Sequence, residues 1–351
     1  MHIKINGRTI GPEHPTYIVA ELSANHNQDF GQAVELIKAA KSSGADAVKL
    51  QTYTPDTITI DSDKEYFHIA GGTPWDNCTL YELYGKAFTP WDWQPKLKAI
   101  CDDMGLDLFS TPFDQSAADF LEKMGVPCYK VASFEIVDIP LIEKIACTGK
   151  PIIMSTGMAS LEEIRTAVDA ARAAGAEQIA LLKCTSAYPA PPEEINLRTI
   201  PHLAETFGVP TGLSDHTLGI VVPVAAVALG ACIVEKHFTL SREIPGPDSA
   251  FSLEPNEFKV MVDSIRTVEK ALGQVDYTVG EFEAKSLVFR RSLFVVEDVK
   301  AGETFTERNV RSIRPGHGLP PKHIRDILGR KATRDVERGT PLDWALVEGK
   351  N

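Results

Sequence analysis

Residues 151–184 read PIIMSTGMASLEEIRTAVDAARAAGAEQIALLKC, and this stretch shows the repeating unit of the fold. It begins with an apolar run rich in β-branched residues, continues with a helical pattern that ends in glycine, and closes with a second apolar run. Continuous apolar runs of this kind are typical of parallel strands that are buried on both faces. The stretch therefore predicts one strand–helix–strand unit.

The same alternation recurs along the first 273 residues. We expect eight strands, which are TYIVAEL from Thr16, AVKLQT from Ala47, DLFSTP from Asp107, CYKVAS from Cys128, PIIMST from Pro151, IALLKC from Ile179, PTGLSD from Pro210 and CIVEKH from Cys232. Eight strand–helix repeats in roughly 270 residues indicate an α/β fold of the (β/α)8 or TIM-barrel type. A doubly wound open sheet is the alternative, but no G-x-G-x-x-G turn follows the first strand.

One long insertion separates the second strand from the third. Residues 70–97 contain three of the four tryptophans of the chain. Insertions on the strand-to-helix side of a barrel commonly wall the active site. We expect a lid or rim here, and a packed surface subdomain is the alternative.

The chain is expected to divide into a barrel domain of residues 1–273, a polar linker of residues 274–284 and a compact β-rich module of residues 285–351. From Lys285 onward there are 14 Lys and Arg against 9 Asp and Glu, although the whole chain has a net charge of −12. The basic module shows no basic run with interleaved aromatics, so nucleic-acid binding is not indicated. Its charge instead favours attraction to the acidic barrel, or delivery of an arginine to an anionic substrate.

Cysteine spacing and hydropathy indicate in which cellular compartment the protein works. The six cysteines are scattered without a CxxC pair, so neither a zinc knot nor a disulfide framework is indicated. No run approaches the roughly 18 apolar residues of a membrane span, and the N-terminal sequence lacks the apolar core of a signal peptide. We therefore expect a cytoplasmic protein with no membrane contact.

Polar side chains gather at the expected C-terminal ends of the strands, where TIM barrels place their catalytic residues. In chain order these are Glu21, Asn25, His26, Lys49, Gln51, Ser110, Thr111, Lys130, Ser133, Glu135, Ser155, Thr156, Lys183, Thr185, Ser186, Ser214, Asp215, His216, Glu235 and His237. A buried lysine is costly without a negative partner, so Lys49 and Lys130 each need one. The phosphate or carboxylate of a substrate would serve, and an internal ion pair with Glu21 or Glu235 is the alternative.

Two histidines end the last two expected strands. His216 and His237 follow neighbouring strands, so their imidazoles can meet over the barrel mouth and bind one divalent ion, with water or a carboxylate completing the coordination. Glu235 and Asp215 lie beside them in the sequence. A structural, hydrogen-bonded role for each ring is the alternative. A site with two protein ligands stays open, which suits Lewis-acid catalysis or water activation.

Ordered motifs along the chain resemble those of a known family. AELSANHNQD, AVKLQT, FSTPFD, YKVASFEI, STGMAS, LKCTSAYPAP, GLSDHTLG, EKHFTL, GPDSAFSLEP and RPGHGLPP are similar, in this order, to the motifs of the sialic acid synthase family. The resemblance covers nearly the whole chain. It implies a (β/α)8 enzyme whose C-terminal module is an antifreeze-like (SAF) domain.

The resemblance also implies an activity and its residues. Members of the family condense phosphoenolpyruvate with an open-chain N-acylated amino sugar, with C–O cleavage, release of phosphate and a divalent metal that is usually Mn²⁺. By resemblance, the metal lies on His216 and His237, and Glu135 or metal-bound water is the base. The phosphoenolpyruvate anion is expected at Lys49, Thr111, Lys130, Ser133, Ser155, Ser186 and Ser214. The sugar is expected at Gln51, Tyr188, Asp248 and Glu21, which we also count as catalytic.

The C-terminal module and two further motifs carry more specific implications about the oligomeric state and the sugar substrate. Arg314 matches an arginine that, in the family, reaches the active site of the partner subunit in a domain-swapped homodimer. The tryptophan-rich insertion and GPDSAFSLEP most resemble members that make pseudaminic acid from 2,4-diacetamido-2,4,6-trideoxy-L-altrose. Ser249 departs from members that use N-acetylmannosamine, which usually have a histidine there.

Three alternatives stay open at this point. The first is synthesis of N-acetylneuraminate or legionaminate by the same chemistry. The second is a metal-dependent barrel aldolase or hydrolase that does not use phosphoenolpyruvate. The third is a non-catalytic sugar-binding protein, which the rim of Lys, Glu and His side chains disfavours because binding alone needs no metal.

Overall fold

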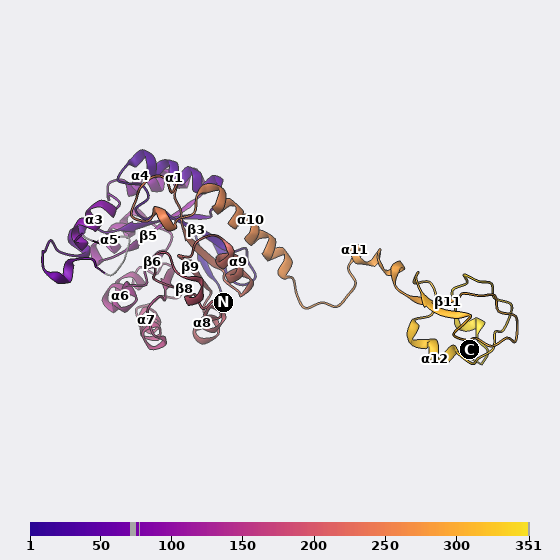
Figure 1. The fold of residues 1–351 in the computed structure, drawn as a ribbon. Helices are drawn as coiled ribbons and strands as arrows, with labels where there is room; N and C mark the ends of the chain where they lie inside the picture. Colours follow the sequence, from indigo (N-terminus) through magenta and orange to yellow (C-terminus); the bar gives the residue numbers. More distant parts are fainter. Residues whose placement is uncertain (71–74, 77, 350–351) are drawn as a thin grey trace. The chain divides into compact units, whose positions relative to one another are not determined.

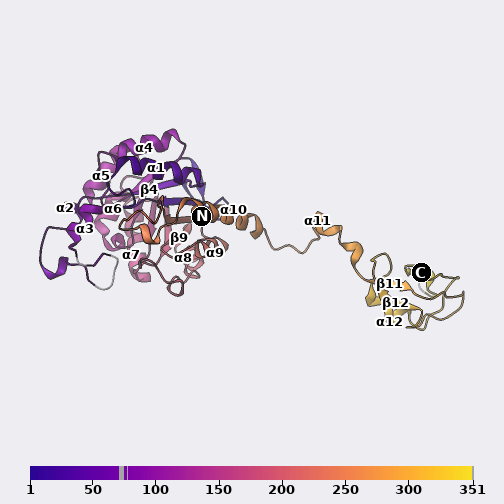
Figure 2. The ribbon, with the colours of Figure 1, turned by 45° about the horizontal axis from the view of Figure 1, so that its top comes forward.

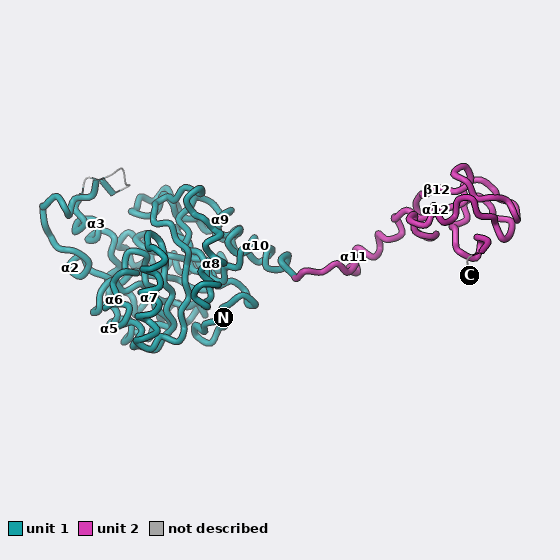
Figure 3. Tube along the Cα trace, turned by 90° about the horizontal axis from the view of Figure 1, so that it is seen from below, with its two compact units in different colours: residues 1–273 teal, residues 274–351 magenta. Residues whose placement is uncertain are grey.

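The computed structural model describes residues 1–70, 75–76 and 78–349. Residues 71–74 and 77 of the tryptophan-rich insertion lie outside this part. The chain divides into two compact units, which are residues 1–273 and 274–351 (Figure 3). Among the described residues, none of the helices combines the length and the apolar composition that crossing a bilayer requires.

Eight parallel strands close into a barrel in the first unit, in the order β10-β3-β4-β5-β6-β7-β8-β9. The strands are β3 (Tyr17–Glu21), β4 (Ala47–Thr52), β5 (Asp107–Pro112), β6 (Tyr129–Val131), β7 (Ile152–Ser155), β8 (Ile179–Cys184), β9 (Thr211–Asp215) and β10 (Ile233–His237). Each coincides with one of the eight apolar runs in the sequence. The (β/α)8 prediction is therefore confirmed, and the open-sheet alternative is wrong.

Helices surround the strands as an outer ring (Figures 1 and 2). They are α1 (Phe30–Ser42), α4 (Gln94–Asp103), α5 (Gln115–Met124), α6 (Ile139–Ala146), α7 (Leu161–Ala173), α8 (Thr199–Phe207), α9 (Val221–Ala228) and α10 (Pro255–Leu272). The shorter α2 (Pro55–Ile58) precedes the insertion, and α3 (Leu80–Ala87) lies in it. Helix α7 begins at a capping box in which Ser160 and Glu163 each bond the other's backbone amide. Its buried Ile164, Ala167 and Val168 share one face because they follow helical spacing.

An N-terminal hairpin, β1 (Ile3–Ile5) and β2 (Arg8–Ile10), was not predicted from the sequence. Its turn is Asn6–Gly7, and both residues have positive φ angles (48° and 83°). An Asn-Gly pair between alternating apolar residues is a hairpin signature. The three isoleucines of the hairpin are buried in the same apolar cluster as residues of the barrel strands, so the hairpin adds to the barrel core.

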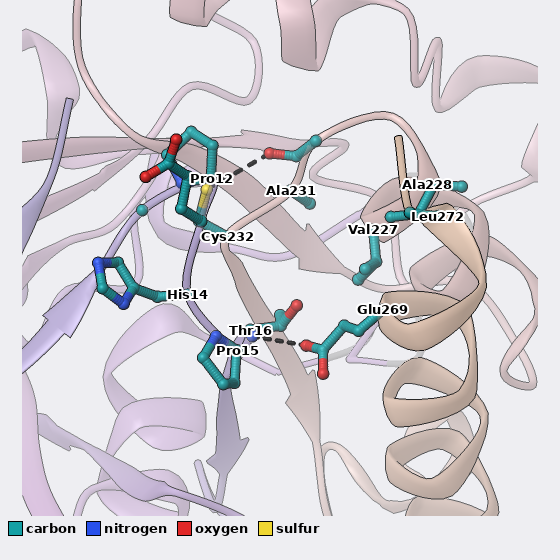
Figure 4. A pocket seen from close by; sticks show the side chains of 14 residues that line it. Pro12, His14, Pro15, Thr16, Val227, Ala228, Ala231, Cys232, Glu269 and Leu272 are labelled. Atoms are coloured by element: carbon teal, nitrogen blue, oxygen red, sulfur yellow. Dashed lines mark hydrogen bonds between the residues drawn. The ribbon is translucent and has the colours of Figure 1, made fainter. Parts of the chain in front are cut away.

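A cavity of about 470 Å³ lies at the N-terminal end of β10, lined by residues 11–16, the loop before β10 and the end of α10 (Figure 4). Glu269 in α10 accepts a hydrogen bond from the backbone amide of Thr16 there (2.6 Å). The polar rim predicted from the sequence contributes no residue to this lining. The cavity is therefore separate from the site described below.

The tryptophans of the insertion do not share one environment. Trp91 packs on Phe120 of α5, with ring centres 4.8 Å apart, and Trp93 packs on Phe30 of α1 at 5.6 Å. This half of the insertion is a packed subdomain on the outer helices. Trp75, in contrast, lies beside Tyr188 of the loop after β8. The packed-subdomain alternative therefore describes the part with Trp91 and Trp93, whereas a lid or rim role for the part with Trp75 stays a prediction.

The second unit is small and has its own core. It contains α11 (Glu281–Ala284), the antiparallel strands β11 (Ser292–Val295) and β12 (Val310–Ile313), and α12 (Ile324–Ile327). Its apolar cluster includes Leu293, Phe305 and Leu342, all fully buried.

Candidate active site

Two lysines and two glutamates form a buried cluster at the C-terminal ends of the barrel strands. Glu235 Oε1 lies 3.3 Å from Lys130 Nζ and 3.5 Å from Lys49 Nζ. Lys49 Nζ also lies 2.9 Å from Glu21 Oε2. In this structure the lysines therefore have internal partners, as the ion-pair alternative expects. The geometry adds that Lys130 has to share its carboxylate with Lys49.

The pKa values of the charged groups in this cluster are shifted in different directions. Burial alone would raise the pKa of Glu235, but the charges of Lys130 and Lys49 outweigh it and lower the pKa to about 2. For Lys130, burial dominates over Glu235 and lowers the pKa, whereas the two carboxylates beside Lys49 raise the pKa of that group despite burial. Lys130 is thus the cation that would gain most from an additional anion.

Hydroxyl groups surround this cluster. Ser214 Oγ donates to Glu235 Oε1 (3.0 Å), and Lys49 Nζ donates to Thr111 Oγ1 (3.4 Å). Further along the rim, the hydroxyls of Ser133 and Ser186 bond each other (2.7 Å). Ser155 Oγ is buried and has no hydrogen-bond partner among the described residues. A buried hydroxyl without a partner costs free energy, so a ligand atom that bonded it would be favoured.

The two predicted metal ligands face each other. The ring centres of His216 and His237 are 5.3 Å apart. A divalent ion lies about 2.1 Å from each imidazole nitrogen it binds, which puts two rings that share an ion on the order of 5 Å apart. The separation therefore fits a shared ion.

The free nitrogen atoms of the two rings support the same fit. His216 Nδ1 bonds the carbonyl oxygen of Thr185 (2.9 Å), so Nε2 is the nitrogen that a cation would use. Burial acts to lower the pKa of His216, but the contact with Cys184 outweighs it and raises that pKa, so a cation that bound Nε2 would displace a proton from this ring. His237 Nδ1 is buried and has no hydrogen-bond partner in the described part of the chain. Burial, aided by the charge of His216, lowers the pKa of His237 well below its usual value, so this ring is neutral at pH 7 and able to bind a cation.

The carboxylates beside the histidines in the sequence do not join them. Asp215 pairs with Lys236 (Nζ–Oδ2 2.5 Å), and Glu235 is bonded to the lysines. Over residues 1–70, 75–76 and 78–349, no three His, Cys, Asp or Glu side chains are arranged to hold one metal ion together. Asp215 and Glu235 are therefore both engaged by lysines. Water or substrate would have to complete the coordination.

Three of the four residues expected at the sugar are linked in one hydrogen-bonded chain, and the fourth, Tyr188, lies beside His216. Gln51 Nε2 donates to Glu21 Oε1 (3.0 Å) and to Ser23 Oγ (2.9 Å), and Ser23 Oγ in turn donates to Asp248. Tyr188 lies over His216, with ring centres 4.4 Å apart. Glu21 of this chain is the register partner of His237 between β3 and β10, so the chain begins next to the histidine pair.

Glu135 opens a short helical turn (Glu135–Val137) after β6. Its Oε2 atom is buried and makes no hydrogen bond to the residues described. Burial raises the pKa of Glu135 to about 7, although Lys130 and Lys49 act in the opposite direction. A carboxylate with a pKa near 7 is suited to proton transfer at neutral pH.

One rim residue, His26, has a structural role, and one member of the hydrogen-bonded chain, Ser23, was not expected from the sequence. His26 is buried, with Nε2 bonded to Thr89 Oγ1 (2.9 Å) and Nδ1 accepting from the amide of Gln28 (3.0 Å), so both ring nitrogens are occupied. Ser23, which links Gln51 to Asp248, was not singled out. Ser23 lies two residues after Glu21, at the same barrel rim, and this position could have identified it.

Arg314 belongs to the second unit. It directly follows β12 and is exposed. Its side chain forms no hydrogen bond or ion pair with any described residue, so its expected role at an active site stays a prediction.

Comparison with known proteins gives consistent matches. The NeuB family model matches residues 36–277, and the SAF domain model matches residues 290–348. The chain is 48% identical to a pseudaminic acid synthase of Helicobacter pylori, over 95% of this chain and 98% of that protein. It is 37% identical to an N,N'-diacetyllegionaminic acid synthase of Legionella pneumophila, over 98% of both chains.

A solved structure agrees with these matches. The crystal structure of an N-acetylneuraminic acid synthetase from Leptospira borgpetersenii, in complex with citrate, superposes with a TM-score of 0.73 and 32% identity. The match covers 82% of this chain and 95% of that one.

Proposed function

Because the chain belongs to the NeuB family, we propose that it is an enzyme that condenses phosphoenolpyruvate with an open-chain N-acylated amino sugar. The products are a nine-carbon 2-keto-3-deoxy acid and inorganic phosphate. The observation that carries the proposal is the position of Lys130. This buried cation shares Glu235 with Lys49 and lies at the barrel mouth that also holds the histidine pair.

In this proposal, phosphoenolpyruvate binds beside Lys130 and Lys49, because these two cations share the carboxylate of Glu235. Its phosphate and carboxylate draw Lys130 and Lys49 partly away from Glu235, because charge-assisted hydrogen bonds to an oxyanion are strong. The hydroxyls of Thr111, Ser155 and Ser214 complete the anion site, with Ser133 and Ser186 along the same rim. Ser155 gains the partner that it otherwise lacks.

Carbon–carbon bond formation comes first in the proposed reaction. The C2=C3 π electrons of phosphoenolpyruvate form a bond from carbon 3 to the aldehyde carbon of the sugar, and the C=O π bond of the aldehyde breaks. The aldehyde oxygen takes up a proton and becomes a hydroxyl group, while positive charge develops at carbon 2. When bound by His216 and His237, a divalent ion such as Mn²⁺ supplies Lewis-acid polarisation of the aldehyde. Glu21, Gln51 and Asp248 orient the sugar, because their hydrogen-bonded chain lies beside the histidine pair.

Water addition and loss of phosphate complete the reaction. Glu135 accepts a proton from a water molecule as that water adds to carbon 2. The bond between carbon 2 and the phosphate oxygen then breaks, and phosphate leaves. The pKa of Glu135, about 7, allows this carboxylate to take up a proton and return it at neutral pH.

Among amino sugars we favour 2,4-diacetamido-2,4,6-trideoxy-L-altrose, which gives pseudaminic acid. The support is the 48% identity to a relative that bears that activity in its name. Ser249 is buried, and its hydroxyl bonds the carbonyl oxygen of Gly246 (3.1 Å), so a small group occupies the position after Asp248. N-acetylneuraminate or legionaminate synthesis by the same chemistry is the second candidate, because relatives with those products also match.

Assembly as a domain-swapped homodimer is part of the proposal. Its support is that Arg314 is exposed in the second unit and forms no hydrogen bond or ion pair with the residues described, so its charge is available to an anionic substrate. A second copy of the chain would bring Arg314 to an active site. We place the reaction in the cytoplasm, where phosphoenolpyruvate is available.

The test is release of phosphate from phosphoenolpyruvate by the full-length protein. The sugar panel is 2,4-diacetamido-2,4,6-trideoxy-L-altrose, N-acetylmannosamine and the legionaminic acid precursor, each with and without chelator. We expect the highest kcat/KM with the first sugar, and loss of turnover on chelation that Mn²⁺ restores. Turnover of a sugar without phosphate release would instead support an aldolase, and binding without turnover would support a non-catalytic protein.

A further inference from the structure

Three aromatic side chains from distant parts of the chain meet at the barrel mouth. Trp75 of the insertion lies 5.6 Å from Tyr188 of the loop after β8, measured between ring centres. Tyr188 in turn lies 5.2 Å from Phe251 of the loop after β10. We refer to Trp75, Tyr188 and Phe251 as the aromatic wall.

The aromatic wall adjoins the histidine pair. The Tyr188 ring is 4.4 Å from His216 and 6.3 Å from His237, and Phe251 is 5.0 Å from His237. A ligand bound at the two imidazoles therefore has the wall beside it. Phosphoenolpyruvate carries three negative charges and has little use for aromatic surface, so the wall belongs to the half of the site that takes the sugar.

Trp75 is hydrogen-bonded to the loop that carries Asp248, one of the residues expected to bind the sugar. Its indole Nε1 donates to the carbonyl oxygen of Pro247 (3.0 Å), the residue before Asp248. Asp248 ends the hydrogen-bonded chain that contains Gln51 and Ser23. Trp75 is only half-buried. The insertion thus contributes one apolar ring beside a carboxylate that is placed to bond sugar hydroxyl or amide groups.

We propose that Trp75 is a specificity-determining residue that, together with Tyr188, binds a methyl-bearing part of the amino sugar. This inference rests on the proposed function and deepens it. A 2,4-diacetamido-2,4,6-trideoxy hexose presents methyl groups at carbon 6 and on the acetamido group of carbon 4, where N-acetylmannosamine has hydroxyl groups. Aromatic rings gain free energy by covering methyl groups and lose it by desolvating hydroxyl groups.

The expected size of the effect follows from such contacts. One methyl or methylene group in an apolar pocket changes kcat/KM by roughly 10-fold to 200-fold. Replacing Trp75 by Ala should therefore reduce the ratio of kcat/KM for the trideoxy sugar to that for N-acetylmannosamine by about 10-fold or more. The KM for phosphoenolpyruvate should not change, because the lysine cluster is not altered.

The experiment compares Trp75→Ala and Trp75→Phe with Trp91→Phe as a matched control. Trp91 belongs to the same insertion, but its Nε1 donates to the carbonyl oxygen of Tyr53 (3.1 Å) and its ring packs on Phe120. We expect Trp75→Phe to keep much of the sugar preference, Trp75→Ala to lose it, and Trp91→Phe to leave it unchanged. Quenching of tryptophan fluorescence by the trideoxy sugar should disappear in Trp75→Phe and persist in Trp91→Phe.

The outcomes separate this inference from the proposed function. An unchanged sugar preference in a folded Trp75→Ala protein that still releases phosphate would overturn the role of Trp75 and leave the proposed function standing. Equal losses for both sugars would also overturn it, because they indicate a structural role. Failure of the wild-type protein to release phosphate with any sugar would overturn both.

Discussion

Lys236 and Asp215 form an ion pair in which both side chains are completely buried, with Nζ 2.5 Å from Oδ2. Each directly precedes a histidine of the candidate metal site. Because successive side chains of a strand alternate in direction, the pair lies on the opposite side of β9 and β10 from the two imidazoles. Lys236 also donates to the carbonyl oxygen of Thr217, so it fastens the loop that carries His216.

Lys236→Met should therefore destabilise the barrel strongly. Removing one partner of a buried pair leaves an uncompensated charge, which costs about 3–5 kcal/mol. Urea denaturation measures this cost as a loss in the free energy of unfolding. As a control, Lys259→Met removes a pair with Asp263 whose side chains are 58% and 64% exposed, and it should cost less than about 1 kcal/mol. Equal effects of the two substitutions would contradict the structural role of Lys236.

Glu135 gives a prediction for the pH profile. Its pKa is about 7, so the carboxylate form that acts as the base is lost as the pH falls through 7. The kcat/KM, which reports groups of the unliganded protein, should decline on the acid side with an apparent pKa near 7, and Glu135→Gln should abolish turnover while phosphoenolpyruvate still binds. Glu143→Gln, on the exposed surface of α6, should retain the wild-type profile. An acid limb that persists in an active Glu135→Gln protein would assign it to another group.

A double substitution can separate two roles of Lys130, which are binding of phosphoenolpyruvate and neutralisation of Glu235. If it binds phosphoenolpyruvate, Lys130→Met should raise the KM for that substrate or eliminate turnover. If it only neutralises Glu235, the additional change Glu235→Gln should restore stability and the KM together, because no buried charge is then left unpaired. We expect the double variant to regain stability, measured by thermal unfolding, without regaining its affinity for phosphoenolpyruvate. Recovery of both the stability and the affinity for phosphoenolpyruvate would show that Lys130 has only a structural role.

The histidine pair predicts a metal-binding defect. His237→Ala should remove high-affinity Mn²⁺ binding, measured by calorimetry on the unliganded protein, and should abolish turnover. The fold should survive, because His237 Nδ1 makes no hydrogen bond to the described residues that the substitution could break. His202→Ala, on the exposed surface of α8, is the matched control and should bind Mn²⁺ normally. Undiminished Mn²⁺ binding by His237→Ala would refute the assignment.

Arg314 predicts complementation between subunits. Arg314→Ala and Glu135→Gln should each be inactive alone. After subunit exchange, half of the dimers carry one copy of each variant, and one of their two sites combines an intact barrel with an intact arginine. The mixture should then recover about a quarter of the wild-type activity, measured as phosphate release. No recovery under conditions in which exchange is demonstrated would count against the domain swap.

Local patterns were sufficient to predict the barrel. Its eight apolar runs and intervening amphipathic helices coincide with the observed strands and helices, because burial on both faces of a parallel strand imposes a continuous apolar sequence. The same patterns placed His216, His237, Lys49 and Lys130 at one rim, since parallel strands in a barrel all end on the same side. The Asn6–Gly7 hairpin has an equally local signal, because an Asn-Gly pair favours the positive φ angles of its turn.

Only the tertiary structure decided which rim residues act together. Sequence spacing placed Asp215 beside His216, but the alternation of the strand turns its carboxylate to Lys236. Spacing could not show that Lys130 and Lys49 share one carboxylate, or that Trp75 comes to lie beside Tyr188 more than a hundred residues away. Such contacts depend on the closure of the barrel and on the direction of single side chains. The sequence by itself determined the architecture and the chemical character of one rim, whereas packing in three dimensions selected the pairs that form the site.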